Sequence, residues 1–160
     1  MSDYPLSKSE FHTLQRELER PRSLLAGRQM KQREVALLCH NAKWTGLRPL
    51  IVMVAIVGAE SLYFTEAVGG PNPNGSYDYG AFQLNGSHAP GLYMSDDEFK
   101  AMAFDPAQAV VFARKLYVAA SYSFRPWYAH TNGSYEKFME KAINGVCNSE
   151  KERLGYGLVH

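Results

Sequence analysis

The sequence predicts an α+β domain that is mostly α-helical and contains one small β-hairpin. Apolar residues recur at helical spacing both before and after residues 69–80, a stretch dominated by Gly, Pro and Asn. That stretch contains Asn74-Gly75, the favoured pair for a tight hairpin turn. A chain of 160 residues can bury one real core but not comfortably two. Helices, a hairpin and further helices in this order are typical of one α+β domain.

Residues 1–28 are predicted to form an N-terminal amphipathic helix and a linker. Ser7 and Glu10 have the spacing of a capping box, and Pro21 ends the helical pattern. The apolar face of this helix carries Phe11, Leu14 and Leu18. The polar, basic residues that follow include Gly27, which suits a linker, so we place the domain boundary there.

Two helices are expected before the hairpin. The first extends from Lys31 to Lys43, where apolar residues recur at helical spacing, and Thr45-Gly46 stops it. The second begins near Pro49, which needs no amide partner in a first turn. Its residues 50–59 are apolar all round, so this helix should be buried, and the run is far shorter than the roughly 20 residues that span a bilayer.

Three further helices are expected after the hairpin. Their start signals are Ser95 with Glu98, Asp105-Pro106 with Gln108, and Gly133-Ser134 before Tyr135. Asn144-Gly145 should end the last of them. Residues 29–146 are therefore predicted to form the folded domain, and residues 147–160 a C-terminal tail.

Composition excludes several classes of function. The net charge of +1 gives no basic field, so no nucleic-acid partner is expected. The start Met1-Ser-Asp-Tyr-Pro5 lacks the pattern of a secretory signal. Neither the two Cys nor the five His show metal-ligand spacing, so no metal or organic cofactor is expected. A buried free thiol at Cys39 is favoured over a disulfide with Cys147. The 20 aromatic residues serve either a Tyr-rich core or the stacking of sugar faces.

Glu60 is the first candidate catalytic residue. It ends a stretch that starts at Pro49 and contains no other ionisable side chain. Burial against apolar walls without a cationic partner should raise the pKa of this carboxyl group, which suits a proton donor near neutral pH. The alternative is a Glu in the last turn of a helix that points to solvent.

Asp78 is the second candidate. Strand alternation places Ser76 and Asp78 on one face of the hairpin and Tyr77 and Tyr79 on the other. If the hairpin folds over the end of the Glu60 helix, two carboxyl groups in different environments face each other, as glycoside hydrolysis requires. The alternative is an Asp that only helps to form a turn.

These residues resemble the catalytic stretch of animal-type lysozymes. In that family a Glu-Ser pair precedes Gly-Ser-Thr-Asp-Tyr-Gly-x-x-Gln-Ile-Asn, and here Glu60-Ser61 precedes Gly75-Ser-Tyr-Asp-Tyr-Gly-Ala-Phe-Gln-Leu-Asn85 at almost the same separation. The resemblance implies a lysozyme-like fold in which the hairpin borders the active-site cleft. It assigns the acid to Glu60 and the nucleophile or electrostatic stabiliser to Asp78. The implied substrate-binding residues are Ser61, Ser76, Gln83 and Asn85.

The segment Trp127-Tyr128-Ala-His-Thr-Asn132-Gly-Ser-Tyr135 resembles the Tyr-Asn-Ala-Gly element of lytic transglycosylases and of lysozyme-like domains in phage endolysins and tail proteins. It departs from that pattern by an insertion between Tyr128 and Asn132. It adds Trp127, Tyr128 and Asn132 as substrate-binding candidates, with a core position as the alternative for Trp127. Resemblance covers about residues 31–146, and the four disulfides of animal lysozymes are absent, so the nearer relatives should be bacterial or viral.

The resemblance implies a hydrolase, a muramidase that cleaves the β-1,4 bonds between N-acetylmuramic acid and N-acetylglucosamine in peptidoglycan. The expected partner is the peptidoglycan glycan strand. The expected context is a phage endolysin released by a holin, or a virion-associated lysozyme, acting as a monomer or within a larger phage protein. One alternative is a lytic transglycosylase that leaves 1,6-anhydro-muramic ends. Another is a noncatalytic glycan-binding module.

Overall fold

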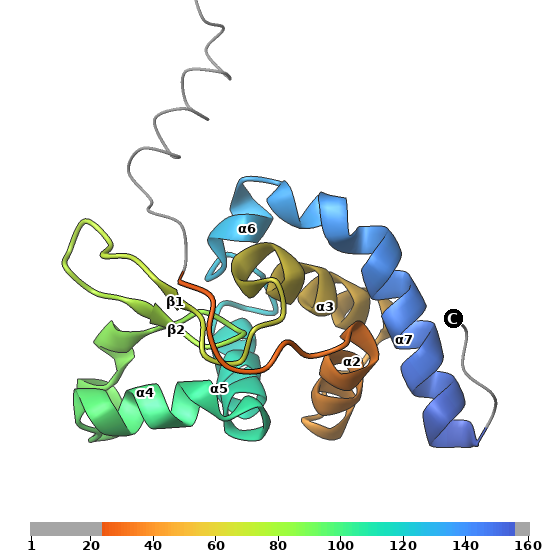
Figure 1. Ribbon diagram of the computed structural model, residues 1–160, viewed down its shortest axis with the longest axis horizontal. Coiled ribbons are helices and arrows are strands. Elements are labelled where there is room, and N and C mark those ends of the chain that lie inside the picture. The colour runs from red at the N-terminus through yellow and green to blue at the C-terminus, as the bar shows by residue number, and fades with distance from the viewer. Residues whose placement is uncertain (1–23, 156–160) are drawn as a thin grey trace, which may run out of the picture.

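The computed structural model describes residues 24–155, which form several helices with a small antiparallel sheet on one side of them (Figure 1). The α-helices are α2 (Gln32–Asn41), α3 (Leu47–Ser61), α4 (Asp96–Phe104), α5 (Pro106–Ala119), α6 (Tyr128–Thr131) and α7 (Met139–Leu154). The strands are β1 (Val68–Gly69), β2 (Asp78–Tyr79) and β3 (Leu84–Asn85), and the 3₁₀ helices are η1 (Gly86–His88), η2 (Pro90–Leu92) and η3 (Ser134–Phe138). This confirms the predicted α+β class. The predicted helix over residues 7–20 lies outside the described residues.

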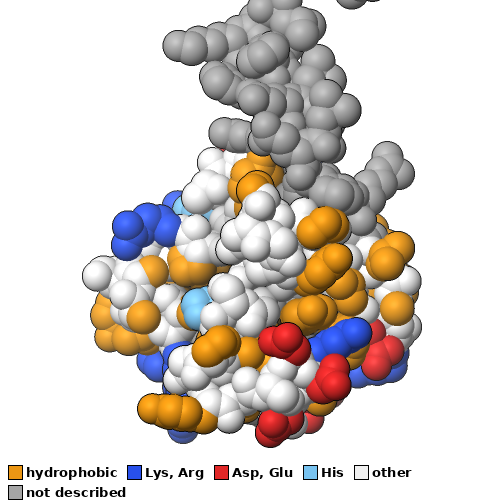
Figure 2. Space-filling view, turned by 90° about the vertical axis from the view of Figure 1, so that its left-hand side faces the viewer, with side chains coloured by type: hydrophobic (Ala, Val, Ile, Leu, Met, Phe, Trp, Pro, Cys, Tyr) orange, Lys and Arg blue, Asp and Glu red, His pale blue; other side chains and the backbone are white. Residues whose placement is uncertain are grey.

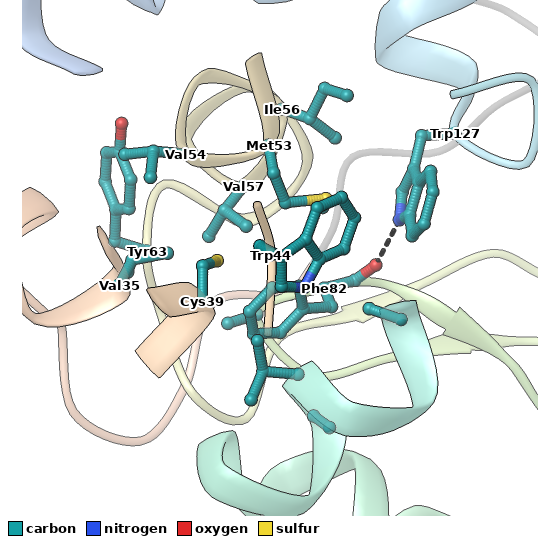
Figure 3. Close-up of a cluster of buried hydrophobic side chains, with 14 of the residues drawn as sticks. Val35, Cys39, Trp44, Met53, Val54, Ile56, Val57, Tyr63, Phe82 and Trp127 are labelled. Carbon is teal, nitrogen blue, oxygen red and sulfur yellow. Dashed lines mark hydrogen bonds between the residues drawn. The ribbon is translucent and has the colours of Figure 1, made fainter. Parts of the chain in front are cut away.

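Helix α3 is the centre of the core. Most of its residues from Leu50 to Gly58 are buried, as the sequence predicts, because α2, α6, α7 and η3 all pack on it. Figure 3 shows side chains of α3 beside Cys39 of α2 and beside Trp44 and Phe82. In Figure 1, α2, α3 and α7 gather on the right and the sheet with α4 on the left. No helix within residues 24–155 is long and apolar enough to cross a membrane.

The sheet has the order β1-β2-β3, with Asp78 opposite both Gly69 and Asn85. The predicted hairpin joins β1 and β2, and Gly75 in its turn has φ +82°. The alternation is also confirmed, because Asp78 is buried whereas the ring of Tyr79 packs against Phe99 of α4. The third strand was not predicted, since two residues form no recognisable pattern.

Helices α4 and α5 start at the predicted caps. Ser95 and Glu98 form a complete capping box, and the Asp105 carboxylate accepts a hydrogen bond from the amide of Ala107. The signal at Gly133-Ser134 begins η3, which leads directly into α7. Helix α6 was not predicted, because four residues are too few to show a helical period.

The segment 24–30 belongs to the fold and is not a loose linker. It pairs with residues 63–68 through isolated bridges, and the amides of Leu24 and Val68 each donate to the other's carbonyl. Gly27 lies inside this pairing with φ +79°, and a Cβ there would lie 2.5 Å from the Thr65 hydroxyl. Gly27 is therefore required for close approach of two chain segments, and the predicted boundary at this residue is wrong.

The predicted end of the last helix at Asn144-Gly145 is also wrong, because α7 continues to Leu154. A Cβ on Gly145 would lie 2.5 Å from the Cβ of Gln32, so this glycine lets α7 pack closely on α2. The helix is capped instead by Gly155 with φ +80°. Residues 147–154 are therefore helical, and a tail cannot begin at residue 147.

Candidate active site

A cavity of about 450 Å³ lies where the end of α3, the sheet and the connection from α5 to α6 meet. Its walls combine polar side chains from the sheet with apolar ones from the helices. It is lined by Glu60, Asn72, Pro73, Asp78, Gln83, Asn85, His88, Leu116, Pro126, Trp127 and Tyr128. Both candidate carboxylates thus face the same space.

Glu60 lies in the last turn of α3 and is only 8% exposed. Its Oε1 accepts a hydrogen bond of 2.8 Å from the backbone amide of Ala129 in α6. The preceding residues of α3, from Leu50 to Gly58, are apolar and belong to the core. The alternative of a solvent-exposed Glu60 is therefore wrong.

Asp78 is also 8% exposed, and two side-chain amides hold it. The Nδ2 of Asn85 donates to Oδ1 at 2.9 Å, and the Nδ2 of Asn72 donates to Oδ2 at 3.3 Å. Both amides also donate to the hydroxyl of Ser76, at 2.9 and 3.2 Å. Because Asp78 is a buried strand residue with both oxygens engaged, the turn-forming alternative is wrong, and its carboxylate has a fixed orientation.

The two acids therefore occupy different surroundings within one cavity. Glu60 is held by a backbone amide at the end of an apolar helix, whereas Asp78 is held by side-chain amides on the sheet. No Lys or Arg among the residues lining the cavity neutralises them. Two carboxyl groups in distinct environments can divide the work of a proton donor and of a stabilising anion.

Gln83 forms a rigid part of the cavity wall. Its Nε2 donates to the carbonyls of Gly80 at 2.9 Å and of Ala67 at 3.2 Å. Its Oε1 is buried and has no hydrogen-bond partner among the described residues. The residue has φ +48°, a left-handed conformation that residues other than glycine rarely adopt.

Three predicted substrate-binding residues do not line the cavity. Ser61 is buried, and its hydroxyl donates to the Val57 carbonyl one turn earlier in α3. Ser76 lies behind Asp78 and accepts from the amides that hold it. Asn132 is exposed, and its side chain accepts from the amide of Ser134 after the end of α6. Each of these side chains has a local structural contact in place of a substrate contact.

Trp127 and Tyr128 do line the cavity, but they differ in exposure. Trp127 is 2% exposed, and its Nε1 donates to the Phe82 carbonyl at 2.9 Å, the dashed line of Figure 3. A sugar cannot stack on a ring with so little exposed surface. This supports the alternative prediction that Trp127 is a core residue. Tyr128 is half-buried at the start of α6.

The structure adds cavity residues that the sequence did not indicate. Asn72, whose amide donates to Asp78, lies among turn-forming residues, so the sequence does not distinguish it from an Asn that only forms the turn. His88 follows β3, and its ring meets Phe112 edge-on at 5.4 Å. The others are Pro73, Leu116 and Pro126. Their placement depends on how α5 and the hairpin pack together, which local patterns do not reveal.

The surface seen in Figure 2 carries mixed charges. Acidic side chains gather on its lower right next to Lys and Arg, and hydrophobic side chains are scattered between polar ones. This face therefore offers no extended basic area to a polyanion.

No family model matches this chain, and no curated protein matches its sequence significantly.

Proposed function

We propose that this protein has a lysozyme-like fold and is a muramidase, hydrolysing the β-1,4 bonds between N-acetylmuramic acid and N-acetylglucosamine in peptidoglycan. The observation that carries the proposal is that Glu60 and Asp78 line one cavity from different elements and in different surroundings. The resemblance of residues 57–85 to the catalytic stretch of animal-type lysozymes supports the same assignment.

Glu60 acts as the general acid. The Ala129 amide donates to Oε1 and so orients the carboxyl group that carries the proton to be transferred. That proton passes to the glycosidic oxygen as the bond from this oxygen to the sugar C1 breaks. The deprotonated Glu60 then takes a proton from the incoming water, which restores the acid.

Asp78 stabilises the positive charge that develops at C1. The amides of Asn72 and Asn85 orient its carboxylate, which lines the cavity, so its negative charge lies beside a sugar bound there. Asp78 either forms a transient bond to C1 or holds the cation until water attacks. In both cases the product is a sugar with an ordinary reducing end.

The remaining walls suit an uncharged, acetylated sugar. The lining includes the amide side chains of Gln83 and Asn85, which are held by hydrogen bonds within the protein, and Leu116, Pro126 and Tyr128 present apolar surface for sugar faces. Together with the resemblance to phage lysozyme-like domains, this supports an endolysin or a virion-associated lysozyme that acts on the bacterial cell wall.

The products released from purified peptidoglycan sacculi test the proposal. Mass spectrometry should find muropeptides with reducing muramic-acid ends. Muropeptides one water lighter, without a reducing end, would replace hydrolysis by the lytic transglycosylase reaction. Binding to the sacculi without any released muropeptide would leave a noncatalytic glycan-binding module.

A further inference from the structure

Gly58, two residues before Glu60 in α3, packs directly against two aromatic rings. A Cβ on Gly58 would lie 2.5 Å from Cδ1 of Phe138 and 2.6 Å from the hydroxyl of Tyr63, closer than real Cβ atoms approach other atoms. The two rings meet edge-on, with centroids 6.3 Å apart and an angle of 73° between their planes. They therefore occupy the space that any other side chain at position 58 would need.

Tyr63 reaches Gly58 because the chain reverses immediately after α3. Leu62 and Tyr63 have φ values of +49° and +67°, a left-handed conformation that non-glycine residues rarely adopt. The amide of Met30 donates to the Tyr63 carbonyl at 2.8 Å and so holds the reversal. Conformations of this kind persist only where the surroundings determine them strongly.

Phe138 belongs to the chain segment that also holds Glu60. The amide of Ala129 in α6 donates to Glu60, and the Ala129 carbonyl accepts a hydrogen bond of 3.4 Å from the hydroxyl of Ser134 in η3. Phe138 is the last residue of η3. The segment 128–138 is thus attached to α3 at two points, the Glu60 carboxylate and the surface of Gly58.

The Tyr63 side chain acts by packing, through its ring and through the hydroxyl that lies over Gly58. The hydroxyl is buried without a hydrogen-bond partner among the described residues, and burial raises the pKa of Tyr63, so it stays neutral. The residue is only 4% exposed and has ring contacts on its apolar surface. A phenylalanine at this position would keep the ring contact with Phe138 but would lose the hydroxyl, the Tyr63 atom nearest to Gly58.

We propose that Tyr63 and Phe138 are positioning residues for Glu60. Packed over Gly58, they set the separation between the end of α3 and α6, and with it the hydrogen bond from Ala129 that orients the acid. The proposal rests on the proposed function of Glu60 as the proton donor. A displacement of about 1 Å at a reacting group costs up to about a hundredfold in rate, so a small shift at this contact is measurable.

The test compares Gly58→Ala with Gly145→Ala, a matched control. Both glycines are buried in helices, and at both a Cβ would lie 2.5 Å from the nearest atom, but Gly145 contacts α2 and not the segment 128–138. Turnover on a soluble glycan is measured per folded molecule across pH, and the Ala129 amide resonance is followed by NMR. Glu60→Ala identifies the shift caused by loss of the acceptor.

Gly58→Ala should lower kcat by about tenfold or more, change KM by less than about twofold, alter the pH profile and move the Ala129 resonance. Gly145→Ala should lower the melting temperature alone. Phe138→Leu removes the ring without a clash, so it gives the same readout if Gly58→Ala does not fold. The positioning role would be overturned if Gly58→Ala or Phe138→Leu kept both the wild-type Ala129 resonance and the wild-type kcat. It would also be overturned if Gly145→Ala lost as much kcat as Gly58→Ala. Absence of cleavage by the wild-type chain would defeat the proposed function, while the Ala129 resonance would still decide whether these rings position Glu60.

Discussion

Asp78 is held by two amide donors, and this determines the effect of its replacement. In Asp78→Asn one carboxylate oxygen becomes an amide group that faces the amide of Asn72 or Asn85, so one donor loses its acceptor. A buried donor without a partner costs about 1–3 kcal/mol of stability. The negative charge that we propose to act on the sugar C1 is lost as well. Activity per folded molecule should therefore fall nearly as far as on replacement of Glu60.

The measurement for Asp78→Asn is the rate of release of soluble muropeptides, normalised by the folded fraction from a urea titration. A transglycosylase would need no second carboxylate, so a loss of only a few fold would contradict the hydrolytic role of Asp78.

The two thiols should react very differently. Cys39 is fully buried in α2, and burial raises its pKa, so neither access nor thiolate is available. Cys147 is exposed on α7, and both cysteines are free, as the sequence predicted for Cys39. Native protein should take up one equivalent of iodoacetamide, located at Cys147 by peptide mass, and denatured protein should take up two. Rapid labelling of Cys39 in the native state would be inconsistent with this packing.

At the scale of residues, sequence reasoning identified the members of the site that carry distinctive chemistry. Glu60 stands out because an apolar helix surrounds it, and Asp78, Gln83 and Asn85 fall in a motif with fixed spacing. Asn72 was missed because its contact with Asp78 depends on the path of the hairpin loop.

At the scale of elements, the N-cap residue Asp105 of α5 should make part of the folding stability depend on pH. The side chain of Gln108 and the amides of Ala107 and Gln108 donate to Asp105, and these hydrogen bonds lower the pKa of its carboxyl group. A folded pKa below the unfolded value means that the stabilisation is fully present above the unfolded pKa and is lost as the pH falls through the folded pKa.

Asp105→Ala should therefore reduce the free energy of unfolding by about 1 kcal/mol at pH 7. The difference between wild type and Asp105→Ala should shrink at pH values below the ordinary carboxyl pKa of 3.8. Urea unfolding of both proteins at pH 7 and near pH 3 measures it. A difference that is unchanged or larger at the acidic pH would rule out the charged cap.

Elements with strong local signals were predicted correctly, and those fixed by tertiary contacts were not. The capping residues Ser95 and Asp105 accept hydrogen bonds from amides two or three residues later, so the starts of α4 and α5 could be predicted from the sequence. Gly27 and Gly145 look like a linker and a helix stop, but each permits close approach to a segment that is distant in the chain. Only the packed structure distinguishes these uses of glycine.

At the scale of the molecule, α3 connects the core to the site. The apolar residues of α3 pack against α2, α7 and η3. Its last turn places Glu60 in the wall of a cavity that residues of the sheet also line. The apolar run predicted a central helix, and the Gly-rich stretch predicted a hairpin. The meeting of the two at one cavity followed only from the motif resemblance, because no local pattern encodes the relative placement of elements.

The central claim is that Glu60 donates the proton that breaks the glycosidic bond, and Glu60→Gln tests it most directly. Gln keeps the volume and an oxygen that can accept from the Ala129 amide, but it has no proton to transfer. The measurement is the clearing of a suspension of purified peptidoglycan, together with the melting temperature of both proteins. Without a transferable proton, clearing should slow by at least about a hundredfold while the melting temperature stays close to that of the wild type. Clearing by Glu60→Gln at nearly the wild-type rate would contradict the claim.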